Sequence, residues 1–214
     1  MKFFLDLVSR TDEERRAFEN HPVVMDAVAN GMSLERYRKF LLELYHVVWH
    51  FNPVTAAAAS RIGDEHRQVR YFLYRHMHEE KGHEEWVLND LRAVGVSADA
   101  CLSHAPHCYT LALNGYNYWA ADRRHPCSIL GMLYALEVIA SVYGGPFSNA
   151  LKERLFLQDE RGVSFVSSHA TLDAEHMAEL REVLNLLEDG PARDAVVESA
   201  TVNFHHFARL FETL

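Results

Sequence analysis

Apolar residues recur at helical spacing along almost the whole chain, and no other feature of the sequence constrains its fold as strongly. Between successive Gly and Pro clusters they return three and four positions apart, which is the spacing of one helix face. The alternating apolar and polar pattern of a half-buried strand is absent from the sequence. The sequence therefore predicts an all-α protein.

Capping residues and helix breakers divide this pattern into predicted helices. The two longest cover about 33–62 and 64–93, with Ser33 and Asp64 as N-caps and Pro53 as the position of a kink. The remaining expectations are short helices within 11–30, a loop at 97–107, helices at about 108–122, 128–143, 147–157, 162–188 and 192–214, and the clearest breaks at 144–146 and 189–191.

The length of the chain favours one domain. A chain of 214 residues buries enough apolar surface to fold without disulfides or structural metals. We find no long linker, low-complexity tract or repeat. The expected architecture is a single domain over 1–214 with about seven to eight helices.

The charge and the cysteines limit the compartment and the partners. Three cysteines without a Cys-x-x-Cys pair argue against a disulfide framework and fit a reducing cytoplasm. We see no signal-peptide pattern and no apolar run long enough to span a membrane. A net charge of -9 disfavours nucleic acid, so a small molecule is the expected partner, and we also expect a homodimer.

The first of three candidate metal motifs lies in the predicted helix 64–93, in a chain with fourteen histidines. Glu80-x-x-His83 places a carboxylate and an imidazole one helical turn apart, as in the metal-binding unit of di-iron helical bundles. His76 extends the pattern by one turn, and Glu79 is an alternative to Glu80 as ligand. By itself, the motif is weak evidence, because Glu, Lys and His are more often found together on solvated helix faces than in metal sites.

The second motif is formed by His169, Asp173 and His176. At about 100° per residue these side chains occupy an arc of about 60° on one helix. The order of His, carboxylate and His repeats the spacing within 76–83. This repetition favours a shared metal site over two solvated faces.

The third signal is Glu137, the only charged residue between Pro126 and Lys152. A buried carboxylate is retained when it is protonated, paired with a cationic side chain or bound to a metal. A neutral acid or a pair with Arg or Lys would explain Glu137 alone, whereas a metal site explains all three signals.

Mixed nitrogen and oxygen donors suit iron or manganese better than a structural zinc site. Three imidazoles and three carboxylates exceed what one ion with open positions needs, so we expect two ions, with Glu137 as a bridge. Glu43 and His46 are candidates for an added ligand or a supporting hydrogen bond. The predicted ligands are Glu80, His83, Glu137, His169, Asp173 and His176.

These motifs in this order resemble the haem-oxygenase-like di-iron oxidases and oxygenases, relatives of the TenA- and PqqC-like proteins. The resemblance covers about 34–187. It implies a haem-oxygenase-like helical bundle and two non-haem irons cycling between Fe(II) and Fe(III), with manganese as an alternative metal. It also implies dioxygen activation, an external electron donor and a small substrate that is fatty-acid-, amine- or amino-acid-like.

Two other enzyme classes share that fold. A haem-degrading haem oxygenase would use an axial histidine, with His46 or His21 as candidates, but it leaves Glu137 unexplained. A metal-free TenA-like hydrolase would use a cysteine nucleophile, Cys108 or Cys127.

Two further alternatives remain. A ferritin-like iron-binding protein fits Asp173-x-x-His176 opposite Glu80-x-x-His83, but leaves His169 surplus. A helical interaction protein with a structural site is the alternative without enzymatic activity.

Overall fold

The described part of the chain is helical throughout. The computed structural model describes residues 2–188 and 190–214, except for the side chains of 170–175. Within these residues there are eleven α-helices, two short 3-10 turns and no strand, so the all-α prediction is confirmed and the number of helices exceeds the expected seven to eight. The elements are α1 (Phe3–Arg10), α2 (Asp12–Glu19), α3 (Pro22–Asn30), α4 (Leu34–Ala59), η1 (Asp64–His66), α5 (Arg67–Glu79), α6 (His83–Ala93), α7 (Ala98–Leu102), α8 (Cys108–Arg123), η2 (Pro126–Ser128), α9 (Ile129–Leu155), α10 (Ser164–Leu184) and α11 (Gly190–Glu212).

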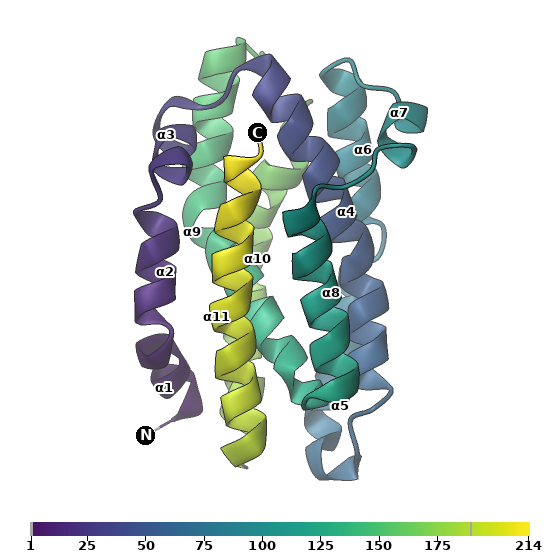
Figure 1. Cartoon of the computed structure of the whole chain (residues 1–214), viewed down its shortest axis with the longest axis vertical. Coiled ribbons are helices and arrows are strands. Elements are labelled where there is room, and N and C mark those ends of the chain that lie inside the picture. The colour runs from purple at the N-terminus through teal and green to yellow at the C-terminus, as the bar shows by residue number, and fades with distance from the viewer. Residues whose placement is uncertain (1, 189) are drawn as a thin grey trace.

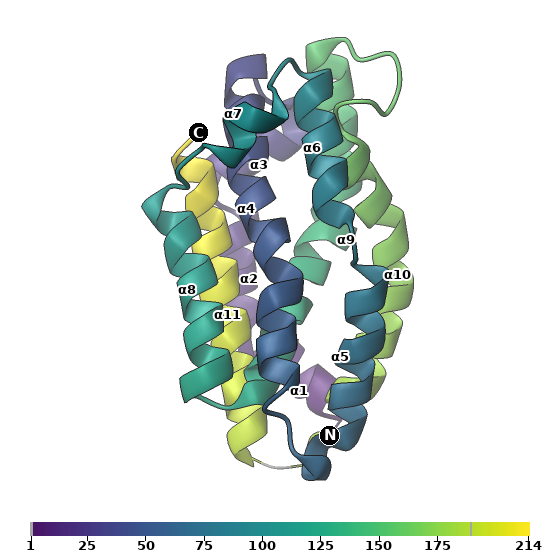
Figure 2. The ribbon, with the colours of Figure 1, turned by 90° about the vertical axis from the view of Figure 1, so that its right-hand side faces the viewer.

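The long helices run along the axis of a bundle (Figure 1). Helix α9 packs against both α10 and α11, and α4 packs against α8. The short helices α1, α2 and α3 follow one side of the bundle beside α11 and α9 (Figure 1). Helices α5 and α6 follow one another along the opposite side, next to α10 (Figure 2).

Helix α4 begins where the sequence predicts. The Ser33 hydroxyl accepts a hydrogen bond from the Arg36 backbone N–H at 3.4 Å, so the predicted N-cap is confirmed. Pro53 lies inside this helix.

The predicted single helix over 64–93 is wrong. After the turn η1 it consists of α5 and α6, separated by residues 80–82. Gly82 has φ +92°, a left-handed conformation that interrupts a helix and that glycine adopts without steric cost. Glu80 and His83 therefore flank a helix break instead of sharing one helical face.

Two further expectations for secondary structure are also wrong. Residues 144–146 do not end a helix, because α9 continues through Pro146 to Leu155. The expected loop 97–107 contains the short helix α7. At Pro146, the packing of α9 against α10 and α11 outweighs the local propensity of the residues. In the expected loop, the Ser97 side chain caps α7 by accepting a hydrogen bond from the Ala100 backbone N–H at 3.2 Å.

Because α9 is continuous, the expectation that no apolar run is long enough to cross a membrane is wrong. The helical segment Pro126–Leu155 meets that test by length and composition. In its most apolar stretch 72% of the residues are buried inside the bundle, as in the core helix of a folded domain.

A buried carboxylate joins α6 to α10. Asp90 accepts hydrogen bonds from the backbone N–H groups of Gly162, Ser164 and Phe165 at 3.1, 2.9 and 2.8 Å, and from the Ser164 hydroxyl at 2.7 Å. These donors are the otherwise unsatisfied groups at the start of α10. Asp90 thus fixes α10 relative to the helix that begins with His83.

Candidate metal centre

Histidine and glutamate side chains from α5, α6, α9 and α10 converge inside the bundle. Their donor atoms form two groups, and within each group all lie within 4.8 Å of one another. We call them the four-residue group and the three-residue group, and Glu80 belongs to both. The four-residue group is His76, Glu80, Glu137 and His176, and the three-residue group is Glu80, His83 and His169.

The four-residue group is built around the carboxylate of Glu137. Its Oε1 lies 3.6 Å from His76 Nε2 and 3.3 Å from His176 Nδ1. His176 Nδ1 also lies 3.7 Å from Glu80 Oε1. The two imidazole rings stand edge to face with centroids 4.9 Å apart, so that one nitrogen of each faces the carboxylates.

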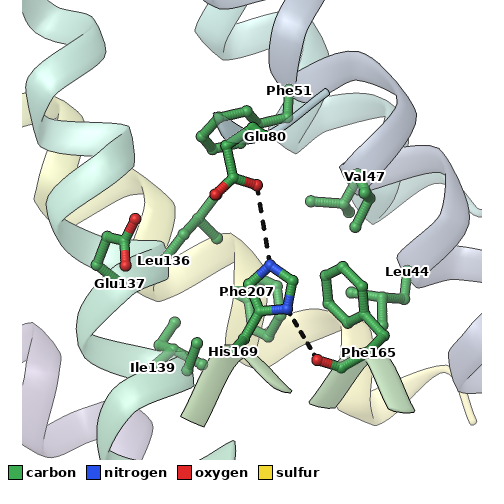
Figure 3. Close-up of a pocket in the computed structure, with 12 residues that line it drawn as sticks. Leu44, Val47, Phe51, Glu80, Leu136, Glu137, Ile139, Phe165, His169 and Phe207 are labelled. Atoms are coloured by element: carbon green, nitrogen blue, oxygen red, sulfur yellow. Dashed lines mark hydrogen bonds and ion pairs between the residues drawn. The ribbon is translucent and has the colours of Figure 1, made fainter. Parts of the chain in front are cut away.

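The three-residue group is built around the other oxygen of Glu80. Glu80 Oε2 lies 2.7 Å from His83 Nδ1 and 3.8 Å from His169 Nε2, and these two nitrogens are 3.2 Å apart. His169 Nδ1 donates to the Phe165 carbonyl oxygen at 2.8 Å, as Figure 3 shows. Because a carbonyl oxygen only accepts, His169 Nδ1 carries a proton, and Nε2 is the nitrogen that faces Glu80 and His83.

Burial sets the protonation of the site. Burial, together with the neighbouring His176 and His83, lowers the pKa of His76 to about 4 against the attraction of Glu80. Burial alone would raise the pKa of Glu80, but hydrogen bonds from His169 and His83 hold it well below its usual range. At neutral pH the site therefore offers a neutral His76 imidazole and an ionised Glu80 carboxylate, the protonation states that bind metal.

The residues present fit a bound cation. His76 Nε2 and Glu137 Oε2 are buried and have no hydrogen-bond partner in the described part of the chain. Buried polar atoms without partners cost about 1–3 kcal/mol each, and a cation between them would satisfy both. Neither Glu80 nor Glu137 has a Lys or Arg within ion-pair distance among the described residues, so a buried pair with Arg or Lys does not explain Glu137.

The structure brings together five of the six predicted ligands, and the side chain of Asp173 lies outside the described residues. His76, which the sequence predicts only as an additional ligand or a supporting residue and which is not among the six predicted ligands, lies in the four-residue group. Glu80, and not Glu137, is the carboxylate common to both groups. The break at Gly82 explains this position, since it lets the chain turn at Glu80 between His76 and His83.

Glu43 and His46 lie outside both groups. Glu43 accepts from His104 Nε2 at 2.8 Å, from the His107 backbone N–H at 3.0 Å and from the Thr110 hydroxyl. His46 Nε2 contacts the His104 carbonyl oxygen at 3.2 Å. These residues hold the chain that enters α8, and the carboxylate of Glu43 is already saturated with donors.

An apolar chamber adjoins the candidate centre. A cavity of about 100 Å³ is bordered by Glu80, Glu137 and His169, and its other lining residues are apolar (Figure 3). A second cavity of about 80 Å³ continues toward Phe18 and Phe211, and among the described residues Tyr143 and His169 are its only polar lining residues. The two cavities, together called the apolar chamber, share Leu44, Ile139, Ala140, Phe165, His169 and Phe207.

Three solved structures share this fold. A domain of unknown function with a haem oxygenase-like fold from Shewanella denitrificans is 24% identical, with a TM-score of 0.86, and the match covers 98% of this chain and 90% of that one. The haem oxygenase of Leptospira interrogans is 16% identical, with a TM-score of 0.81 and full coverage of both chains. A TenA homologue from Pseudomonas syringae is 16% identical, with a TM-score of 0.82, and the match covers 98% of this chain and 91% of that one.

These identities establish the fold alone, and they confirm the expected haem-oxygenase-like bundle. No curated protein matches the chain. Residues 38–205 match the model of a family described as iron-containing redox enzymes. Because this match covers most of the chain and includes both ligand groups, the protein belongs to the family of iron-containing redox enzymes.

Proposed function

We propose that the protein is a non-haem di-iron oxidase or oxygenase that uses dioxygen to oxidise a small organic substrate. The observation that carries the proposal is the pair of ligand groups sharing Glu80, with buried donor atoms of His76 and Glu137 that have no partner in the described part of the chain. Two adjoining sets of nitrogen and oxygen donors suit two iron ions, with manganese as the alternative. When bound, the metal would supply the redox chemistry with dioxygen.

The chain itself contributes geometry, protonation and the exclusion of water. His76 presents a neutral imidazole nitrogen, the Phe165 carbonyl orients the His169 ring, and the ionised Glu80 belongs to both groups. The apolar walls of the chamber keep bulk water from the side of the site where the substrate would lie. An external electron donor would return the metal to its reduced state. That donor, the homodimer and the cytoplasmic location stay predictions.

The chamber favours a fatty-acid-like substrate among the three expected classes. Within the part of the chain that the structure describes, no Lys, Arg, Asn or Gln lines either cavity. The ammonium and carboxylate of an amino acid would both need partners, whereas an aliphatic chain with one polar end needs partners only at the centre. The polar end would lie by Glu80, Glu137 and His169, and the chain would extend toward Phe18.

The other classes account for less of the geometry. The axial-histidine candidates of a haem oxygenase are engaged elsewhere, His46 with a backbone carbonyl and His21 with Glu212 at 3.0 Å. The nucleophile candidates of a TenA-like enzyme, Cys108 and Cys127, line neither cavity of the chamber. Neither the haem oxygenase class nor the TenA-like class uses the buried donors of both ligand groups.

Oxygen uptake tests the proposal. Metal-free protein would be loaded anaerobically with ferrous iron and mixed with oxygenated buffer containing saturated fatty acids of increasing chain length. We expect substrate-dependent oxygen consumption in the wild type and its loss in His176→Ala. Full turnover by the metal-free protein, or a Soret band and bile-pigment formation on adding haem, would refute the proposal.

A further inference from the structure

Each histidine of the four-residue group has two ring nitrogens. We call the nitrogen that faces Glu137 the inner one and the other the outer one. The inner nitrogens, His76 Nε2 and His176 Nδ1, face Glu137. The outer nitrogens both face one oxygen of Glu79. Glu79 Oε2 lies 3.9 Å from His76 Nδ1 and 3.7 Å from His176 Nε2.

We propose that Glu79 is a positioning residue that orients both histidines of the four-residue group for metal binding; this inference rests on the proposed function. A carboxylate at the outer nitrogen favours the tautomer that carries the proton there, which leaves the lone pair on the inner nitrogen. Its negative charge also makes each imidazole a more basic ligand. Both distances exceed the length of a hydrogen bond, so the carboxylate acts on the imidazoles through its charge.

The exposure of Glu79 suits this role. Its side chain is 44% exposed and in contact with solvent, whereas Glu80 and Glu137 are buried. Glu79 belongs to neither ligand group. It lies at the outer edge of the site, one residue before the shared ligand.

Other contacts orient the two histidines of the three-residue group. His169 Nδ1 donates to a backbone carbonyl, and His83 stacks on Trp86 with ring centroids 4.1 Å apart. No ion pair joins Glu79 to His83 or His169 among the described residues. Loss of the Glu79 charge should therefore weaken metal binding by the four-residue group and leave metal binding by the three-residue group unchanged.

Calorimetric titration of the metal-free protein with Co(II) tests this difference. We expect two binding steps in the wild type, and the step that disappears in Glu137→Ala is the step of the four-residue group. Glu79→Gln keeps the size of the side chain and removes its charge. It should weaken that step about tenfold and leave the other step unchanged.

Glu85→Gln is the matched control, because Glu85 is also exposed and belongs to neither group. Equal melting temperatures of the metal-free variants would show that the fold is retained. The inference is overturned if Glu79→Gln binds both ions like the wild type, or if both steps weaken equally. Absence of any Co(II) binding by the wild type would overturn the proposed metal function as well.

Discussion

The four-residue group and the three-residue group differ in how many anionic side chains they contain and in what borders them. The first has two carboxylates, from Glu80 and Glu137, and the second has only the shared Glu80 among the described residues. More anionic ligands bind a cation more tightly. His169 of the three-residue group lines both cavities of the apolar chamber, whereas Glu137 of the four-residue group lines only the first, and His76 and His176 line neither. The four-residue group is thus suited to hold a cation more tightly, and both groups border the chamber.

The largest effect is expected from the residue that the two groups share. Glu80→Ala removes a carboxylate oxygen from each group, so both ions should be lost. Elemental analysis of the purified, iron-loaded variant should find almost no iron. One iron retained per chain would mean that Glu80 serves a single group and that the sites are independent.

A smaller effect on metal content is expected from a ligand that belongs to one group. Glu137→Ala should bind about half as much iron as the wild type, because only the four-residue group loses a carboxylate. Equal loss of both ions would contradict the division into two groups.

Substitution of Glu137 should lower the metal content but raise the stability of the metal-free protein. Glu137 Oε2 is buried without a hydrogen-bond partner in the described part of the chain, which costs about 1–3 kcal/mol. Glu137→Leu should therefore raise the free energy of unfolding of the metal-free protein by about 1 kcal/mol or more, measured by urea denaturation. Destabilisation by this substitution would mean that the carboxylate stabilises the fold without metal.

A structural substitution should act on the three-residue group from a distance. In Asp90→Asn an amide N–H₂ replaces a carboxylate oxygen that accepts backbone donors at the start of α10. We expect a loss of about 2 kcal/mol in the free energy of unfolding, since buried donors lose their acceptor. Metal affinity should fall more at the three-residue group, which contains His169, than at the four-residue group. Unchanged stability would show that other contacts fix α10.

The smallest effect is optical. Trp86 stacks on His83 and meets His169 edge to face at 5.8 Å, so paramagnetic Co(II) in the three-residue group should quench its fluorescence. Trp86→Phe should abolish the quenching with little change in affinity. Trp119→Phe, which alters an exposed tryptophan on α8, should keep it. Quenching that persists in Trp86→Phe would place the bound metal elsewhere.

The sequence predicted the helical class and most of the candidate site because both depend on local signals. Helical spacing is a property of neighbouring residues, and the apolar residues on both sides of Glu137 indicate a buried charge by themselves. The break at Gly82 also had a signal, since glycine commonly follows the end of a helix. The helical spacing of the residues on both sides of Gly82 obscured this signal.

Other features depend on packing between distant segments. The burial of His76, 2% exposed, and the sharing of Glu80 arise only when α5, α6, α9 and α10 assemble. Likewise, Pro146 lies within an unbroken α9, because the contacts of that helix with α10 and α11 outweigh the loss of one backbone donor. No local pattern carries this information.

Anomalous scattering at the iron edge, from crystals soaked anaerobically with ferrous iron, would locate the ions bound by the two ligand groups. Two peaks are expected, each within bonding distance of a Glu80 oxygen, one beside His76 and Glu137 and the other beside His83 and His169. A single peak without Glu80 as ligand, or iron bound only at the surface of the bundle, would contradict this expectation.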